Sequence, residues 1–255
     1  AERIILGLGG SATNDGGCGA AAALGVEFLD AEGKAFVPVG GTLRRIAHIR
    51  TDGLLPALRQ AEVIAMCDID NPLCGESGAA AVFAPQKGAD AATVRMLDEG
   101  LAHLAAVIEK DLGRSLLALP GGGAAGGFGA GSVAFLGARL QMGIEAVLDL
   151  TDFDRLAADA YLVITGEGRL DSQSLRGKVV VGVARRARAL GVPVVALVGS
   201  SETDIAAAYD AGVTAVFPIN PAPTTLSEAL AHARTHLAFT AENVLRFARC
   251  LEENR

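Results

Sequence analysis

Strand-like apolar runs alternate with helical segments through the last hundred residues, and this alternation most restricts the fold. The run at 192–198 is almost wholly apolar, as expected for a buried strand of a parallel sheet. Strands are expected at 161–165, 192–198 and 214–218, and helices at 179–190, 204–211 and Leu226–Glu253. Alternation at this spacing predicts right-handed βαβ units and therefore an α/β fold with parallel strands.

The first part of the chain is less regular and richer in glycine. It contains an expected hairpin with strands at 26–29 and 34–37, a strand at 62–67, a long amphipathic helix at Ala91–Leu112 and a helix at 133–142. We therefore predict two α/β domains. Residues 1–155 would form a Gly-rich substrate and nucleotide domain, and residues 156–255 a second domain, with the boundary inside 150–158.

Charge and cysteine content exclude several classes of function. The formal net charge of −7, without a basic stripe, argues against a nucleic-acid partner. No apolar run reaches the length that crosses a membrane, so no membrane partner is expected. Four cysteines without metal-finger spacing favour reduced thiols and a cytoplasmic location. The sequence does not indicate an oligomeric state.

The stretch 6–19, LGLGGSATNDGGCG, lies between a strand-like run at 3–8 and a helix-like segment at 20–24. A glycine loop between a strand and a helix favours anion binding, because backbone N–H groups can approach the ligand closely. The polar groups of this loop are Ser11, Thr13, Asn14 and Asp15. The alternative is a tight turn in which these side chains only cap backbone groups. The stretch alone does not decide between the two.

Two further stretches combine glycine with polar groups. The first holds Asp68, Asp70, Asn71 and Glu76, with Lys87 further along, and its carboxylates could bind Mg²⁺ or form an Asx-rich turn. The second, 121–131, matches G-x-G-x-x-G at 121–126, but the strand that a dinucleotide fingerprint needs does not precede it. Two interpretations of this stretch remain. It could be a loop that binds polyphosphate, or its glycines could allow close helix packing.

The stretch 166–178, GEGRLDSQSLRGK, is expected to be a loop that follows a strand. Its charged or long polar groups are Glu167, Arg169, Asp171, Gln173, Arg176 and Lys178. Arg169 suits bidentate capture of a carboxylate or phosphate, Asp171 could accept a proton, and Lys178 could neutralise a transferred phosphate. A solvated, salt-bridged loop is the alternative. Together the stretches indicate phosphoryl transfer, which needs positioning and charge neutralisation more than a special nucleophile.

Four motifs in this order resemble the type II glycerate kinase family, the bacterial glycerate 2-kinase group. They are GLGGSATNDGGCG at 7–19, CDIDNPLCGESGAAAVFAPQKGA at 67–89, PGGGAAGGFGAG at 120–131 and ITGEGRLDSQSLRGK at 164–178. The resemblance implies ATP-dependent phosphorylation of D-glycerate to phosphoglycerate with Mg²⁺, with 2-phosphoglycerate as the favoured product. It also implies two α/β domains, the C-terminal one Rossmann-like, with the active site in a cleft between them.

The resemblance also implies roles for single residues. Asp171 is expected to be the general base, with Asp15 second. Glycerate would be held by Ser11, Thr13, Asn14, Arg169, Gln173 and Lys178. ATP would be held by Asn71, Gly122, Gly123, Gly126 and Gly127, and Mg²⁺ by Glu167.

One departure from the family pattern affects the expected activity. Members open with a segment that carries D-S-F-K and D-G-G-E-G-T motifs, and this sequence does not contain them. We therefore expect an N-terminally truncated chain whose Rossmann-like domain lacks its N-terminal part. Such a chain would leave a sheet edge exposed and have little kinase activity alone.

Two other functions remain open at this point. The first is a nicotinamide-dependent reductase of hydroxy acids, which would use the glycine cluster as a dinucleotide loop. The second is a non-catalytic module that binds a small metabolite. The first predicts NADH binding, and the second predicts glycerate binding without turnover.

Overall fold

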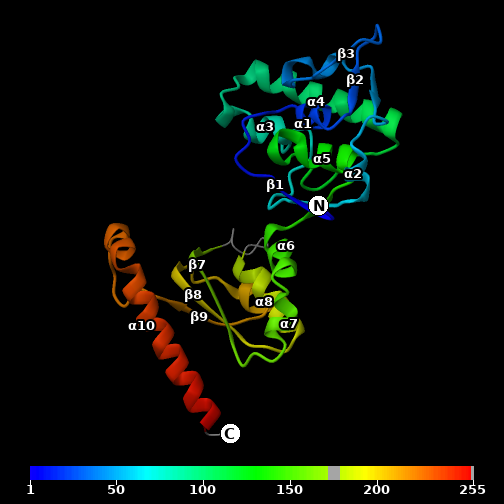
Figure 1. The fold of residues 1–255 in the computed structure, drawn as a ribbon. Coiled ribbons are helices and arrows are strands. Elements are labelled where there is room, and N and C mark those ends of the chain that lie inside the picture. Colours follow the sequence, from blue (N-terminus) through cyan, green and yellow to red (C-terminus); the bar gives the residue numbers. More distant parts are fainter. Residues whose placement is uncertain (172–178, 254–255) are drawn as a thin grey trace. The chain divides into compact units, whose positions relative to one another are not determined.

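The computed structural model describes residues 1–171 and 179–253. The chain divides into two compact units, which we call unit 1 (Ala1–Gly143) and unit 2 (Ile144–Arg255). They divide earlier in the chain than the predicted boundary at residue 155. Each unit is described by itself below, and both are drawn in Figure 1.

Unit 1 contains a parallel sheet of three strands in the order β1-β5-β6. The strands are β1 (Arg3–Gly7), β5 (Glu62–Met66) and β6 (Arg139–Gln141). Ile5 pairs with Ile64, and Ala65 pairs with Leu140. The prediction of a helix through residue 142 was wrong in its second half. The helix ends at Leu136 because Gly137 adopts a left-handed conformation (φ 65°), which frees the next residues to join the sheet.

A second, antiparallel sheet of unit 1 has the order β3-β2-β4. It consists of β2 (Glu27–Leu29), β3 (Ala35–Phe36) and β4 (His48–Arg50). The Asp30 carboxylate accepts a hydrogen bond from the Lys34 N–H at 2.9 Å and so closes the turn between β2 and β3. The predicted hairpin is therefore confirmed.

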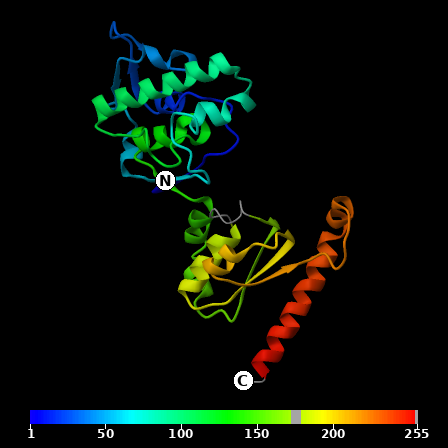
Figure 2. The same ribbon diagram turned by 180° about the vertical axis from the view of Figure 1, so that it is seen from behind.

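Most helices of unit 1 bury apolar side chains, whereas the short helix at 56–60 has no buried residue. They are α1 (Cys18–Ala23), α2 (Pro56–Gln60), α3 (Ala79–Phe83), α4 (Ala91–Leu112) and α5 (Ala124–Leu136), with 3₁₀ turns η1 (Gly40–Arg45) and η2 (Pro85–Lys87). The long teal-to-green helix of unit 1 in Figure 2 is α4, and its bounds agree with the predicted ones. Asp90 caps its start by accepting from the Thr93 N–H, and Leu101, Leu104 and Ile108 are buried along one face.

Unit 2 contains a sheet of three parallel strands in the order β7-β8-β9. The strands are β7 (Val163–Leu170), β8 (Val194–Ser201) and β9 (Val213–Pro218). The helices are α6 (Gly143–Leu150), α7 (Phe153–Ala157), α8 (Val179–Ala189), α9 (Ala206–Ala211) and α10 (Leu226–Glu253). The predicted parallel α/β arrangement of this part of the chain is confirmed (Figure 1).

Both faces of this sheet are covered, and β8 shows why. Side chains of successive strand residues point to opposite faces. Val194 and Val198 pack with Val180 and Ala184 of α8, whereas Val195 and Leu197 pack with Val244 of α10. This alternation explains why β8 is apolar along most of its length.

Strand β7 is longer than predicted. The prediction ended it at Thr165 and placed residues 166–170 in a loop, but these residues continue the strand to Leu170. Gly166 pairs with Leu197, and a Cβ at Gly166 would lie 2.3 Å from the Leu197 carbonyl oxygen. Glycine therefore serves close strand pairing here, and the loop prediction was wrong for this part.

Arg186 of α8 binds three carboxylates of α6 and the α7 region. Its guanidinium donates to Glu145 at 3.0 Å, to Asp149 at 2.9 Å and to Asp154 at 2.9 Å. The hydrogen bonds with Asp154 raise the pKa of Arg186, so the group stays charged. These contacts fasten α6 and α7 to α8, which explains why the chain from Ile144 belongs to unit 2.

Replacing Arg186 by methionine should lower the free energy of unfolding of unit 2 by about 1–3 kcal/mol, because three carboxylates would then lie together without their cation. This expected loss is smaller than that for breaking a fully buried ion pair, because the Arg186 side chain is 25% exposed and water screens its charge. Urea unfolding followed by circular dichroism measures the change. Arg155→Met is the matched control, because Arg155 is exposed and pairs only with Asp152 among the described residues. Equal losses in both variants would contradict the proposed fastening.

Unit 2 also exposes apolar side chains along α10. Leu226, Leu230, Phe239 and Phe247 are each at least 60% exposed.

Among the described residues, the chain has no helix that combines the length and the apolar character needed to cross a bilayer.

Candidate functional site

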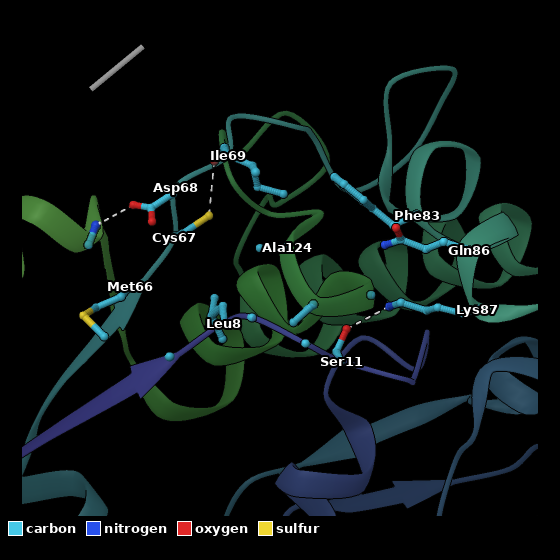
Figure 3. Close-up of a pocket in the computed structure, with 16 residues that line it drawn as sticks. Leu8, Ser11, Met66, Cys67, Asp68, Ile69, Phe83, Gln86, Lys87 and Ala124 are labelled. Carbon is cyan, nitrogen blue, oxygen red and sulfur yellow. Dashed lines mark hydrogen bonds between the residues drawn. The ribbon is translucent and has the colours of Figure 1, made fainter. Parts of the chain in front are cut away.

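A pocket of about 440 Å³ lies in unit 1 at the ends of strands β1 and β5 (Figure 3). In open parallel sheets, ligands bind at the carboxyl ends of the strands, and this pocket has that position. It is lined by Gly7, Leu8, Gly9, Gly10, Ser11, Met66, Cys67, Asp68, Ile69, Phe83, Gln86, Lys87, Ala124, Ala125, Gly126 and Gly143. We call it the unit 1 pocket.

Residues 7–11 form the wall of this pocket that follows β1. A Cβ at Gly9 or at Gly10 would meet no atom within 4 Å, so backbone at these two positions faces open space. A ligand can approach such backbone closely, and exposed N–H groups in a glycine loop attract anions. The first half of the opening glycine stretch therefore lines a pocket, in addition to forming a turn.

Lys87, which lies 76 residues after Ser11 in the sequence, contacts this wall. Its Nζ donates to the Ser11 hydroxyl oxygen at 2.8 Å and to the Thr13 carbonyl oxygen at 2.7 Å. Partial burial lowers the pKa of Lys87, and the charge of Asp15 opposes that shift. Both acceptors are neutral oxygens, and no carboxylate of the described residues lies within 4 Å of this ammonium.

Asp68 lies on the other side of the unit 1 pocket (Figure 3). Its Oδ1 accepts a hydrogen bond from the Gly143 N–H at 2.7 Å. Asp68 lies two residues after the end of β5, where a carboxylate can reach a ligand at the end of a parallel strand. The pocket therefore carries a cation on one side and an anion on the other.

Asp15 caps the start of α1. One carboxylate oxygen accepts from the Gly17 N–H and the other from the Gly19 N–H, both at 3.0 Å. This is the structural role that the sequence left open for the loop, and both oxygens of Asp15 have a partner in it.

Asn14 is buried in the same loop, with 8% of its surface exposed. Neither its amide nitrogen nor its amide oxygen has a hydrogen-bond partner among the described residues. Leaving a buried amide without partners costs free energy, so such a group in a native fold needs an explanation. A ligand bound beside residues 11–14 would supply one, which supports the predicted role of this loop.

The glycine-rich stretch around α5 packs directly on the opening loop. Gly126 accepts a hydrogen bond from the Gly16 N–H through its carbonyl oxygen at 3.0 Å. A Cβ at Gly126 would lie 2.1 Å from the Thr13 carbonyl oxygen. Ala125, next to it, has a left-handed backbone (φ 53°), which is strained for a residue with a side chain and is common at functional sites. Ala124, Ala125 and Gly126 all line the unit 1 pocket.

The other residues predicted to hold ATP serve packing in this structure. A Cβ at Gly123 would lie 2.3 Å from the Pro72 carbonyl oxygen, and one at Gly122 would lie 2.9 Å from that of Leu119. Gly127 is likewise surrounded by Gly16, Leu101 and Leu73 at 3.0 Å. Asn71 donates from its amide to the Ser77 carbonyl oxygen at 2.8 Å and so closes its own turn. Of the predicted ATP residues, only Gly126 lines the pocket.

The remaining predicted site residues belong to unit 2. Glu167 lines a pocket of about 740 Å³, together with Thr165, Asn220 and apolar residues of α10. Arg169 lies 3.6 Å from Asp171 and 3.1 Å from Glu202, so its guanidinium is held between two carboxylates. Gln173 and Lys178 lie outside the described residues.

The residues that the structure describes do not form a recognisable Mg²⁺ site. In the part of the chain that the structure describes, no three or more His, Cys, Asp or Glu side chains come together as metal ligands would. Glu167 alone cannot supply the several oxygen ligands that Mg²⁺ needs. We therefore derive no step of the reaction through a metal ion.

The sequence-based list of site residues missed part of the unit 1 pocket. Asp68 was considered only as a possible Mg²⁺ ligand or turn residue, and Lys87 received no role. Gly9 and Gly10 belong to a stretch in which only polar side chains were assigned. The proximity of Lys87 to Ser11 joins positions 76 residues apart, which no local pattern predicts. The signal that could have found Lys87 is that it is the only cationic side chain in the motif at 67–89.

Comparison with known proteins gives one consistent result. The model of the glycerate kinase family matches residues 1–249. A glycerate kinase of Halalkalibacterium halodurans is 47% identical over 243 residues, which cover 95% of this chain and 64% of that protein. The glycerate 2-kinase of Escherichia coli is 43% identical over 244 residues, which cover 96% of this chain and 64% of that protein.

A solved structure is also similar. A crystal structure provisionally assigned as glycerate kinase 2 from Salmonella typhimurium LT2 matches with a TM-score of 0.81 and 44% sequence identity. The match covers 99% of this chain and 65% of that one. The chain thus spans about 64% of the length of the curated relatives that it matches.

Proposed function

The chain belongs to the glycerate kinase family, and from this membership we propose that the protein carrying it phosphorylates D-glycerate with ATP. The product we propose is 2-phosphoglycerate, since the E. coli relative is named a glycerate 2-kinase. Three free thiols, Cys18, Cys67 and Cys74, support a cytoplasmic location for it.

The structural observation that best supports this proposal is the composition of the unit 1 pocket. The unit 1 pocket draws its walls from three of the family motifs, those at 7–19, 67–89 and 120–131, which lie far apart in the sequence. Motifs that serve only local folding have no reason to meet around one open space. A small pocket with exposed glycine backbone and charged groups suits a small hydroxy acid or a phosphate group.

The proposed roles combine the placement of the unit 1 residues with the roles that the family resemblance implies for residues of unit 2. In unit 1, Ser11, Thr13 and Asn14 would bind glycerate, and the backbone at Gly126 would contact ATP. In unit 2, Arg169 would bind the substrate carboxylate, with Gln173 and Lys178 beside it in the chain. Asp171 would take the proton of the substrate hydroxyl while that oxygen forms the bond to the γ-phosphorus and ADP leaves.

The relatives also contain residues beyond the part that this chain matches. Because the chain spans about 64% of its relatives, we propose that the rest of the family length contributes to the active enzyme. The exposed side chains of α10 and the edge strand β7 would provide surface for it to cover. We therefore expect the 255-residue chain alone to turn over D-glycerate far more slowly than a protein of full family length.

The test is a kinase assay with identification of the product. The 255-residue chain and a protein of full family length are each incubated with ATP and D-glycerate, and ³¹P NMR reports which oxygen carries the phosphate. We expect 2-phosphoglycerate from the longer protein and little product from the shorter chain. Full-length rates from the 255-residue chain would contradict the need for further length. NADH binding without phosphorylation would favour the reductase, and glycerate binding without turnover in both proteins would favour the binding module.

A further inference from the structure

We propose that Lys87 binds the anionic group of the ligand in the unit 1 pocket, either the carboxylate of glycerate or a phosphate of the nucleotide. This inference rests on the proposed function, since it assigns a residue to the chemistry of that pocket. Lys87 comes from the motif at 67–89, for which the sequence indicated only a metal site or a turn.

The first argument is the charge balance around Lys87. Its ammonium contacts two neutral oxygens, those of the Ser11 hydroxyl and the Thr13 carbonyl. A partly buried cation without an anionic partner is costly, and a bound anion would remove that cost. Structural lysines avoid this situation by pairing with a carboxylate or by keeping the ammonium in water. No carboxylate of the described residues contacts the Lys87 ammonium, and the charge of Asp15 acts on it from beyond ion-pair distance, so an anion in the pocket can still pair with it directly.

The second argument counts hydrogen-bond donors. A lysine ammonium has three N–H groups, and the two oxygens of Ser11 and Thr13 use two of them. The third has no acceptor among the described residues. Since Lys87 lines the unit 1 pocket, an anion bound there can receive this donor. The same lysine would then hold the ligand and fix the loop that contacts it.

The third argument is the polarity of the pocket. Figure 3 shows Lys87 and Ser11 on one side and Asp68 on the other. An anionic group is repelled by the Asp68 carboxylate and attracted by Lys87, so it binds at the Lys87 side. Hydroxyl groups of the same ligand can then donate toward Asp68. The two charges therefore orient a molecule that carries an acid group and hydroxyls.

The variant Lys87→Gln tests the charge, because glutamine keeps an amide donor for Ser11 and Thr13 but is neutral. The matched control is Lys110→Gln, which removes the same charge from an exposed position on α4. Titration calorimetry on a protein of full family length measures binding of D-glycerate, its neutral amide, ATP and inorganic phosphate, at low and high salt. Thermal unfolding of each variant measures whether the fold is kept.

We expect Lys87→Gln to weaken binding of one charged ligand at least tenfold and to remove most of the salt dependence of that binding. Binding of the neutral amide should change less than twofold, and Lys110→Gln should behave like the parent chain. Loss for D-glycerate identifies the carboxylate as the anion, and loss for ATP with unchanged D-glycerate binding identifies the phosphate. Lys87→Arg, which keeps the charge, should recover part of the lost affinity.

Two results would overturn the inference. Unchanged affinity for all charged ligands in Lys87→Gln would leave the proposed function in place and remove Lys87 from binding. Equal losses for D-glycerate and its neutral amide would show that Lys87 only braces the loop. If the parent chain bound phosphate alone, with loss in Lys87→Gln, the inference on Lys87 would stand and the proposed function would fall. Binding of none of the four ligands would overturn both.

Discussion

Replacing Gly126 by alanine should lower the free energy of unfolding of unit 1 by about 2–5 kcal/mol and weaken D-glycerate binding at least tenfold. The added Cβ would lie 2.1 Å from the Thr13 carbonyl oxygen and 2.8 Å from the Asn14 Cα. The backbone at this position is left-handed (φ 67°), which adds about 1–2 kcal/mol of strain for alanine. The opening loop would have to move, and its residues line or adjoin the unit 1 pocket.

Gly137→Ala is the matched control for this prediction. Gly137 has nearly the same backbone (φ 65°), but a Cβ there would meet nothing within 4 Å. It should therefore cost only the conformational strain of about 1–2 kcal/mol and leave ligand binding unchanged. Urea unfolding and calorimetric titration of both variants separate strain from collision. Equal effects in the two variants would show that the contact between the glycine-rich stretch and the opening loop has no special weight.

The elements with clear local signals could be predicted from the sequence. The helix at Ala91–Leu112 shows apolar residues at helical spacing and a capping Asp90, and its bounds were right. The hairpin around Asp30 has turn chemistry that needs no distant partner. The strands of unit 2 are apolar because helices cover both faces of their sheet.

The errors arose where tertiary pairing outweighs local preference. The sequence of the short strand β6 favours neither a helix nor a strand. It becomes a strand because it pairs with the edge of β5. Strand β7 continues through Gly166 and Gly168, which the sequence marks as loop, because it pairs with β8. At Gly166 this pairing requires glycine, since a Cβ would lie 2.3 Å from the Leu197 carbonyl oxygen.

The candidate site also contains features that the local sequence predicts and features that depend on tertiary contacts. The glycine stretches could be identified as important, but whether each glycine opens space for a ligand or lets backbone pack depends on neighbours from elsewhere in the chain. Gly9 and Gly10 face open space, whereas Gly123 and Gly126 contact backbone. The pairing of Lys87 with Ser11 is likewise a tertiary contact that residue spacing does not reveal.

Replacing Asp171 by asparagine should lower the turnover number about 10²–10⁴-fold, the range expected for loss of a general base, with D-glycerate affinity changed less than threefold. Asparagine keeps the shape of the side chain and removes its ability to accept the hydroxyl proton. Asp171 follows directly on β7, and its carboxylate lies 3.6 Å from the Arg169 guanidinium.

The matched control for Asp171 is Glu202→Gln, because Glu202 is the other carboxylate held by Arg169, at 3.1 Å. Each variant removes one anionic partner of the same guanidinium, so any effect that acts only through Arg169 should appear in both. A loss of turnover confined to Asp171→Asn would assign proton transfer to that residue, whereas unchanged turnover would remove it from the mechanism. Steady-state kinetics with D-glycerate, in a protein of full family length and over a range of pH, gives the comparison. The acid limb of the turnover profile should disappear in Asp171→Asn and persist in Glu202→Gln, because only the first variant lacks the proposed proton acceptor.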